Sequence, residues 1–325
     1  MSAGRSFLSI SALLVLAIAV FTAYFSHSSN MRLQALKTKN ANAFFPGQTA
    51  LVVGGTSGIG EGIARRLAEA HFNVIVAGRS AERGNAIVRE MQTVYPEGTF
   101  RFLAVDSFLL ANIRGLAASV PSLDKLVLTQ GMATIQGYTP TSEGIDQKLA
   151  LHYYGRMAFI QEFLPVLRQS THSPRVLSVL SAGIHSPYAL FRVDPELQTH
   201  YSIKNAADAA GFYNDLMLDA WSADPANAGI AFGHAAPGFV STNWGTEMPW
   251  IIRVLIRPLQ RLLGRSKADC GEFMSDFLLA DDVVPGGRLH LMDQYGEPAN
   301  VTAAHTDDAK LFMREHTLER INRGV

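Results

Sequence analysis

The sequence predicts a doubly wound α/β fold of the Rossmann type, a single domain with a parallel sheet, preceded by an N-terminal transmembrane helix. Three observations lead to this prediction. From Gln48 onward, short apolar runs alternate with longer amphipathic runs. A glycine-rich turn joins the first apolar run to the first amphipathic one, and 19 uncharged residues, 7–25, come before both. Parallel strands need right-handed crossovers, which helices of this length supply.

The apolar runs are expected to be strands and the amphipathic runs helices. Val74-Ile75-Val76 is apolar throughout, which is typical of a strand buried on both faces. We predict strands at 49–53, 73–77, 100–105, 125–128, 175–180 and 230–232. We predict helices at 58–70, 81–94, 109–120, 142–168 and 202–222.

The uncharged N-terminal run has the length of a membrane-spanning helix. At about 1.5 Å per residue it matches a hydrocarbon core of about 30 Å. A cleaved signal peptide is the alternative, since Arg5 supplies a positive N-terminal region. The run is longer than a usual signal-peptide core, and Ala23-Tyr24-Phe25 is a poor cleavage site. We therefore expect an uncleaved anchor.

Positive charge on the two sides of this run predicts its orientation. Arg32, Lys37 and Lys39 follow the run, whereas Arg5 alone precedes it. By the positive-inside rule the main domain then lies in the cytoplasm. We predict a single-pass anchor and linker at 1–46, in the endoplasmic reticulum membrane, and the main domain at 47–325.

Composition excludes two classes of partner. Twenty-eight basic residues balance 28 acidic ones, so the chain lacks the basic excess of a nucleic-acid-binding protein. We expect no nucleic-acid partner. The single cysteine, Cys270, excludes an intramolecular disulfide and a cysteine-based metal site. We expect no metal.

The glycine-rich turn is the strongest local signal. It runs from Val52 to Gly60, after the first strand and at the start of the first helix. Glycines there permit a tight turn and let a pyrophosphate approach the free N–H groups of the helix N-terminus. A plain turn is the alternative. The residues predicted to contact a dinucleotide are Gly54, Thr56, Ser57, Gly58, Ile59 and Gly60.

The end of the second strand indicates which dinucleotide binds. NAD-preferring folds usually place an acidic residue there, but this chain has Gly78 and then Arg79. A guanidinium suits a 2′-phosphate, which predicts NADP(H); an exposed loop arginine is the alternative. Asp106, after the third strand, is a candidate for the adenine edge or an ordinary helix N-cap.

These motifs resemble the short-chain dehydrogenase/reductase family over about residues 47–300. Val53–Gly60 is similar to the family's Thr-Gly-x-x-x-Gly-x-Gly, with valine in place of threonine. Pro237–Thr242 resembles its Pro-Gly turn beside the nicotinamide, and Thr141–Gly144 resembles retinol-dehydrogenase-like and fungal members. The resemblance implies an oxidoreductase in which the cofactor also contacts Gly131, Pro237, Gly238, Val240 and Thr242.

The family's catalytic residues are Asn, Ser, Tyr and Lys, and the resemblance carries them over unevenly. Ser181 matches the serine that binds the substrate oxygen, and Tyr201 is preferred as the proton donor. Asn205 stands where the lysine is expected, so Lys204 is expected to serve from the i+3 position. His152 replaces the helix asparagine, as a proton relay or an ordinary packed histidine.

This variant set predicts the direction of the reaction. Hydride transfer to a carbonyl leaves an alkoxide that a phenol can protonate, and a nearby cation would lower the phenol pKa of about 10. With the lysine displaced, we expect an NADP(H)-dependent oxidoreductase that favours reduction. The alternative is a cofactor-binding pseudo-enzyme that acts as a sensor or interaction partner.

An amphipathic insertion is predicted at 246–265, with Arg253, Arg257, Arg261 and Arg265 at every fourth position among apolar residues. It suits a membrane surface, a lid over the substrate or a helix packed on the core, and these alternatives stay open. The first two favour a lipophilic small-molecule substrate. The alanine-rich helix after Lys204 is expected to pack on the core or in a homodimer.

Overall fold

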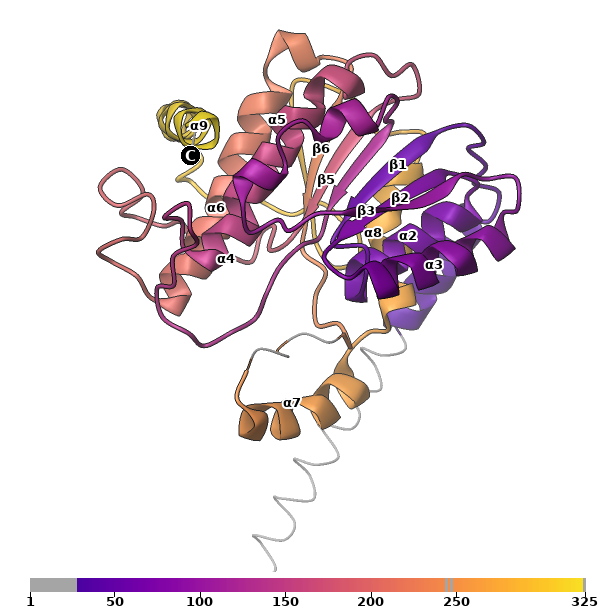
Figure 1. Cartoon of the computed structure of the whole chain (residues 1–325), viewed down its shortest axis with the longest axis horizontal. Helices are drawn as coiled ribbons and strands as arrows, with labels where there is room; N and C mark the ends of the chain where they lie inside the picture. The colour runs from indigo at the N-terminus through magenta and orange to yellow at the C-terminus, as the bar shows by residue number, and fades with distance from the viewer. Residues whose placement is uncertain (1–27, 243–244, 246–247, 324–325) are drawn as a thin grey trace, which may run out of the picture. The chain divides into compact units, whose positions relative to one another are not determined.

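The computed structural model describes residues 28–242, 245 and 248–323. Residue contacts divide the chain into residues 1–41, of which 28–39 are helical where described, and residues 42–325. Within the described part of the second unit, one parallel sheet of seven strands has the order β3-β2-β1-β4-β5-β6-β7 (Figure 1). The strands are β1 Thr49–Val53, β2 Asn73–Gly78, β3 Phe100–Ala104, β4 Lys125–Leu128, β5 Arg175–Val179, β6 Ala231–Ala235 and β7 Leu289–Met292.

Helices cover both faces of this sheet (Figure 1). One face carries α2 (Gly58–Glu69), α3 (Ala81–Val94) and α8 (Lys267–Leu279), and the other carries α5 (Gly155–Leu167), α6 (Ile203–Ser222) and α9 (Asp307–Asn322). Gly62 and Gly271 bring α2 and α8 together, because a Cβ on Gly62 would lie 2.0 Å from the Lys267 carbonyl oxygen. The doubly wound fold is therefore confirmed.

The strand order reverses between β1 and β4. These two strands are parallel neighbours, with Ala50–Val53 of β1 paired with Lys125–Leu128 of β4. Chains leaving these two strands turn to opposite faces and open a crevice at their carboxyl ends. All six predicted strands are present, with ends shifted by a few residues at most. Strand β7 and helices α8 and α9 were not predicted.

Two predicted helices are wrong in detail. Residues 109–120 form two 3₁₀ segments, Leu110–Asn112 and Leu116–Ser119, because Gly115 between them has φ 77°. The Glu143 carboxylate also accepts hydrogen bonds from the Leu110 and Ala111 amides, at 2.7 and 2.9 Å. The helix predicted at 142–168 begins only at α4 (Gln147–Leu149) and continues through a π turn at Ala150–Tyr154.

Among the described helices, none is both long and apolar enough to span a bilayer. The predicted anchor at 7–25 lies outside the described residues. The transmembrane part of the predicted fold is thus without support here.

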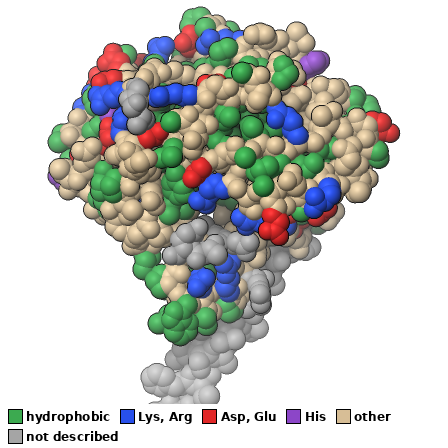
Figure 2. Space-filling model, viewed as in Figure 1, with side chains coloured by type: hydrophobic (Ala, Val, Ile, Leu, Met, Phe, Trp, Pro, Cys, Tyr) green, Lys and Arg blue, Asp and Glu red, His purple; other side chains and the backbone are tan. Residues whose placement is uncertain are grey.

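Helix α7 (Trp250–Leu263) forms within the predicted insertion and exposes apolar side chains. Trp250, Ile251 and Val254 are 66%, 56% and 61% exposed and lie within about 100° of one another around the helix. Arg257 points back toward the domain and donates to the Thr242 carbonyl oxygen at 2.9 Å. Hydrophobic and basic side chains lie next to each other on this helix (Figure 2). An apolar face this exposed does not fit a helix buried in the core.

Candidate active site

A cavity of about 550 Å³ opens at the carboxyl ends of the central strands. Its walls come from the loops after β1, β2, β3, β4, β5 and β6. It brings together every residue that the sequence predicts to contact the cofactor. These are Gly54, Thr56, Ser57, Gly58, Ile59, Gly60, Arg79, Asp106, Gly131, Pro237, Gly238, Val240 and Thr242.

The glycine loop leaves room for a ligand at the start of α2. Gly54 has φ 80°, and a Cβ on Gly60 would lie 2.4 Å from Thr129 Oγ1 and 2.5 Å from the Gly54 carbonyl oxygen. Ser57 is the N-cap, but its side chain accepts no capping hydrogen bond. The N–H groups of the first turn therefore face the cavity without an intrahelical partner, as anion binding requires.

Two arginines line the cavity near the end of β2. Arg79 lies over the Phe108 ring at 5.2 Å, and Arg83 follows one helical turn later in α3. No carboxylate in the described part of the chain forms an ion pair with either. Gly78 is close to Thr56, so that a Cβ there would lie 3.0 Å from its methyl group. Sequence reasoning missed Arg83, although its spacing of four from Arg79 was a usable signal.

Asp106 lines the same end of the cavity and also stabilises its own turn. Its carboxylate accepts from the Phe108 amide at 3.2 Å, and its carbonyl oxygen accepts from the Asn112 side chain at 3.1 Å. One carboxylate oxygen is thus used locally. Asp106 is not the helix N-cap that the sequence offered as the alternative, because Leu109 precedes the 3₁₀ segment; its contact with the cofactor stays a prediction.

Gln130 presents a buried amide to the cavity. Its side chain is 6% exposed, and neither its oxygen nor its nitrogen has a hydrogen-bond partner among the described residues. A buried amide without a partner costs roughly 1–3 kcal/mol. The sequence offered only a weak signal, Gln130 within the altered turn 128–131.

Arg156 fixes the backbone beneath the cavity. It is 1% exposed and donates to the carbonyl oxygens of Gln130 and Val179, at 2.7 and 2.9 Å. Burial lowers the pKa of its guanidinium to about 9. Arg156 therefore holds the ends of β4 and β5 in register where the cavity begins.

His152 lines the cavity as a neutral imidazole. Burial, together with Arg156 and Lys148, lowers its pKa to about 3. Its Nε2 accepts from the Met132 amide at 3.0 Å. Because that nitrogen carries no proton, a relay through it would first have to break the bond to Met132.

Tyr201 lies just before α6 and does not line the cavity. Its hydroxyl is 2.5 Å from Lys148 Nζ and donates to the Gln136 carbonyl oxygen at 3.3 Å. Burial and the charge of Asp146 raise its pKa to about 12. Lys204 instead forms an ion pair with Asp208 at the surface, with its own side chain 74% exposed. The cation beside the phenol is therefore Lys148, not the predicted Lys204.

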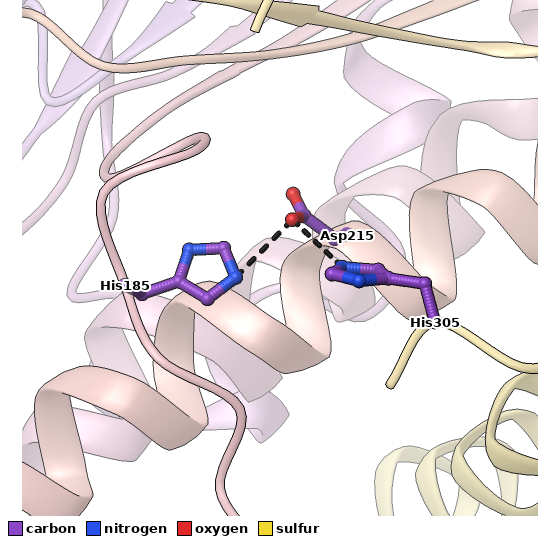
Figure 3. A group of neighbouring side chains, drawn as sticks. All are labelled: His185, Asp215 and His305. Carbon is purple, nitrogen blue, oxygen red and sulfur yellow. Dashed lines mark hydrogen bonds and ion pairs between the residues drawn. The ribbon is translucent and has the colours of Figure 1, made fainter. Parts of the chain in front are cut away.

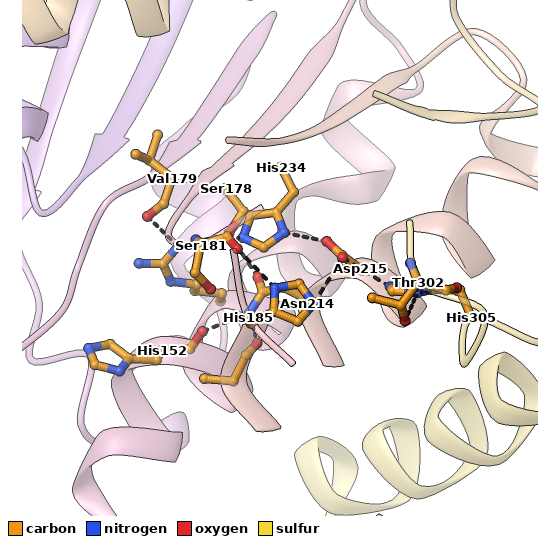
Figure 4. A network of polar contacts seen from close by, with 12 residues as sticks. His152, Ser178, Val179, Ser181, His185, Asn214, Asp215, His234, Thr302 and His305 are labelled. Carbon is orange, nitrogen blue, oxygen red and sulfur yellow. Dashed lines mark hydrogen bonds and ion pairs between the residues drawn. The ribbon is translucent and has the colours of Figure 1, made fainter. Parts of the chain in front are cut away.

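Ser181 lies in a buried network beside the cavity (Figure 4). Its hydroxyl has no hydrogen-bond partner among the described residues. Its N–H donates to His234 Nε2 at 3.1 Å, and its carbonyl oxygen accepts from His185 Nδ1 at 2.9 Å. Gly211 of α6 faces it, since a Cβ there would lie 2.5 Å from Ser181 Oγ. The structure does not place Ser181 or Tyr201 in the cavity wall.

Comparison with known proteins identifies the family. Residues 48–249, more than half of the chain, match the family model described as short chain dehydrogenase. The chain belongs to the short-chain dehydrogenase family. The 34% identical oxidoreductase AN1596 of Emericella nidulans matches over 65% of this chain and 64% of its own length. The oxidoreductase andH of Emericella variicolor is 32% identical, over 59% and 58%. The chain thus spans less than two thirds of both relatives.

Other proteins are less identical to this chain but match it over a larger share of its length. A polyprenol dehydrogenase of Mus musculus is 27% identical over 77% of this chain and 76% of its own length. The structure of a short chain dehydrogenase from Burkholderia cenocepacia in complex with NADP covers 77% of this chain and 98% of its own. It superimposes with a TM-score of 0.56 at 21% identity. This likeness shows the fold.

In the short-chain dehydrogenase pattern implied by the sequence resemblance, the lysine follows the tyrosine by four residues. The position of Lys148 departs from this pattern. Here the lysine comes from α4, 53 positions before Tyr201. Desolvation by burial lowers the pKa of Lys148, against the opposing effect of Asp146. Sequence reasoning missed it because it considered only lysines next to the tyrosine in the chain.

Proposed function

We propose that this short-chain dehydrogenase is an NADP(H)-dependent oxidoreductase that reduces a carbonyl group of a lipophilic small molecule. The observation that carries the proposal is the pair Arg79 and Arg83 in the cavity wall, free of carboxylate partners among the described residues. Two guanidiniums without internal partners favour a dianionic 2′-phosphate over a ribose hydroxyl.

The cavity suits the rest of a dinucleotide as well. The first turn of α2 would bind the pyrophosphate, and the Pro237–Val240 turn would lie beside the nicotinamide. When bound, NADPH supplies a hydride. The Burkholderia cenocepacia structure in complex with NADP, at 21% identity, supports this reading by analogy. So does the structure of an alcohol dehydrogenase from Thermococcus sibiricus complexed with 5-hydroxy-NADP, at 18% identity.

Reduction is favoured because the candidate acid stays protonated. A Tyr201 phenol with a pKa of about 12 can donate a proton near neutral pH but is a poor base for oxidation. Lys148, 2.5 Å away, is placed to stabilise the phenolate that remains. In this scheme Ser181 would hydrogen-bond the substrate oxygen, as the family resemblance implies.

A lipophilic substrate fits the apolar surfaces near the cavity mouth. Ile184 and Phe239 line the cavity and are 72% and 46% exposed. The exposed apolar face of α7, defined by Trp250, Ile251 and Val254, follows in the chain. The mouse relative is a polyprenol dehydrogenase, which is consistent with a lipophilic substrate.

We also propose that residues 7–25 anchor the chain in the endoplasmic reticulum membrane with the main domain in the cytoplasm. The support is the uncharged run with its following positive charges. Alkaline carbonate extraction of membranes from expressing cells tests it. We expect the full-length chain to stay in the membrane fraction. We also expect protease added outside intact microsomes to digest the main domain. Release into the supernatant would contradict the anchor.

Cofactor preference is the direct test of the proposed function. We expect the double change Arg79→Gln and Arg83→Gln to weaken NADPH binding by about a hundredfold, since two charge-assisted contacts are lost. NADH binding should change by less than about threefold. Arg89→Gln, an exposed arginine of α3 outside the cavity wall, is the matched control. Equal losses for both cofactors would contradict the proposed role.

The second candidate function is that of a cofactor-binding protein without turnover. The favouring observation is that neither Ser181 nor Tyr201 lines the cavity. A panel of lipophilic aldehydes and ketones with NADPH separates the candidates. Tight NADPH binding with no substrate turned over would favour the sensor or partner role.

A further inference from the structure

A second polar centre lies deeper in the fold, around Asp215 of α6. Its carboxylate is 1% exposed, and three histidine rings surround it. His185 comes from the loop after β5, His234 from β6 and His305 from the segment between β7 and α9. No lysine or arginine in the described residues pairs with Asp215, so an ionised carboxylate there needs its positive charge from elsewhere.

Hydrogen-bond chemistry fixes the protons on two of the rings. His234 Nε2 accepts from the Ser181 amide, so its Nδ1 carries the hydrogen and donates to Asp215 Oδ1 at 2.5 Å. His185 Nδ1 lies 2.9 Å from the Ser181 carbonyl oxygen, which can only accept, so this nitrogen also carries a hydrogen. A neutral His185 therefore turns the lone pair of Nε2 toward Asp215.

In the neutral ring, this lone pair faces a carboxylate oxygen that has no hydrogen to donate, whereas a doubly protonated ring would donate to that oxygen. His185 Nε2 is 3.2 Å from Asp215 Oδ2, and it has no hydrogen-bond partner with acceptable geometry among the described residues. His305 Nε2 is 3.0 Å from the same oxygen. His305 Nδ1 lies 3.1 Å from the Thr302 carbonyl oxygen and 3.0 Å from the Thr302 amide N–H, so either tautomer of this ring has a partner; with the hydrogen on Nδ1, the lone pair of Nε2 faces Asp215. The two ring nitrogens thus face the same carboxylate oxygen (Figure 3).

We propose that His185 Nε2, Asp215 Oδ2 and His305 Nε2 bind one divalent transition metal ion, for which Zn²⁺ is the best match. The three ligand atoms lie within 4.8 Å of one another. A tetrahedral Zn²⁺ with ligands at about 2.0–2.1 Å separates them by about 3.3 Å. The two nitrogen–oxygen distances, 3.2 and 3.0 Å, match this value, and the two ring nitrogens, which lie within 4.8 Å of each other, would approach to it on binding. A water molecule would complete the coordination, as in other three-ligand sites.

The surroundings are those of a metal site. Ligating histidines usually donate their second N–H to a backbone carbonyl or a carboxylate, and His185 has this arrangement with Ser181 while His305 has it available with Thr302. His234 orients the second oxygen of Asp215. Imidazole and carboxylate ligands suit Zn²⁺, and the sequence analysis missed the site because its ligands lie 30 and 90 positions apart.

The ion would join three segments around Ser181. The loop after β5, α6 and the segment before α9 each supply one ligand. Ser181 is bonded to His185 through its carbonyl and to His234 through its amide. Occupancy of the site would therefore fix the backbone at the residue predicted to bind the substrate oxygen. Metal binding itself does not depend on the proposed oxidoreductase activity.

Metal content and thermal unfolding of the full-length protein test the proposal. After treatment with a chelator and dialysis, the wild type should take up about one Zn²⁺ per chain with a raised melting temperature. Co²⁺ in its place should give visible absorption typical of a low-coordinate site. His185→Gln and His305→Gln, on two separate segments, should each lose the stoichiometric ion, the melting shift and the Co²⁺ spectrum.

His290→Gln is the matched control, because His290 lies outside the cluster and contacts the Val284 carbonyl oxygen. It should bind Zn²⁺ like the wild type. Far-ultraviolet circular dichroism checks that each variant is folded, and either ligand variant that is folded suffices. The proposal is overturned if the chelated wild type binds no stoichiometric Zn²⁺, or if the folded ligand variants bind it as well as His290→Gln.

Discussion

The glycine-loop side of the cavity and the β5–α6 side differ in how their functional groups are arranged. On the first side, the residues chosen from sequence all line one cavity. On the second side, Ser181, Tyr201 and Lys204 lie outside the cavity wall and are bonded to other parts of the chain. A binding site made by backbone groups can be predicted from a short sequence motif. A catalytic site made by side chains depends on how segments that are distant in the sequence pack together.

Changes at Tyr201 should have the largest effect and would sharpen this contrast. We expect Tyr201→Phe to lower the rate of carbonyl reduction by about a thousandfold, the range of general acid catalysis. Lys148→Met should lower it by about tenfold, and Lys204→Met by less than twofold, because Lys204 is bonded to Asp208 at the surface. Single-turnover reduction with NADPH measures all three. A larger loss in the Lys204 variant than in the Lys148 variant would restore the expectation from sequence.

The glycine loop should tolerate almost no side chain. Gly60→Ala brings a Cβ against Thr129 Oγ1 and the Gly54 carbonyl oxygen, and we expect about a hundredfold weaker NADPH binding. Fluorescence titration measures it. Gly229→Ala, where a Cβ meets nothing within 4 Å, should bind as the wild type does. Comparable NADPH binding by the two variants would contradict the conclusion that the backbone of the glycine loop forms this part of the binding site.

A pH effect is expected outside both regions. Burial, with a smaller contribution from Arg175, lowers the pKa of Lys125 to about 7. Between pH 7 and 10 the unfolded chain then binds the proton that the folded chain has lost, so the free energy of unfolding rises with pH. The rise should be on the order of 3 to 4 kcal/mol. Lys125→Met should remove it in urea unfolding at several pH values; an unchanged slope would contradict the assignment.

The smallest effect is expected at Gln130, where the two sides meet. Gln130→Leu removes a buried amide that has no hydrogen-bond partner among the described residues, and we expect about fivefold weaker NADPH binding without a loss of stability. Calorimetric titration and thermal unfolding give the two quantities. If the variant unfolds earlier and binds NADPH normally, the amide has a structural partner instead.

Sequence reasoning could predict the sheet because each buried strand is a continuous apolar run, such as Val74-Ile75-Val76. It failed at residues 109–120, where Gly115 and the distant Glu143 carboxylate replace a helix with two short turns. It missed β7 and α9, since no strand or helix was predicted beyond residue 265. Local periodicity predicts an element only where distant side chains do not compete for its backbone.

The candidate site divides along the same line. Arg79 was predicted because its position after β2 has a fixed geometric meaning in this fold. Lys148 could not be predicted, because it reaches Tyr201 only through the packing of α4. His305 could not be predicted either, because it reaches Asp215 only through the packing of the segment before α9. The roles of Ser181, Tyr201 and His152 remain predictions.

Helix α9 has a practical consequence for anyone who trims this protein. The family match ends at residue 249, yet Met313, Thr317 and Ile321 of α9 are buried in the same core as the sheet. Tyr153 of the π turn bonds to Thr317, and Tyr154 bonds to His316 at 2.8 Å. A chain cut at the homology boundary would expose this apolar surface and aggregate, so a purification tag belongs after the last residue and not in place of the final helix.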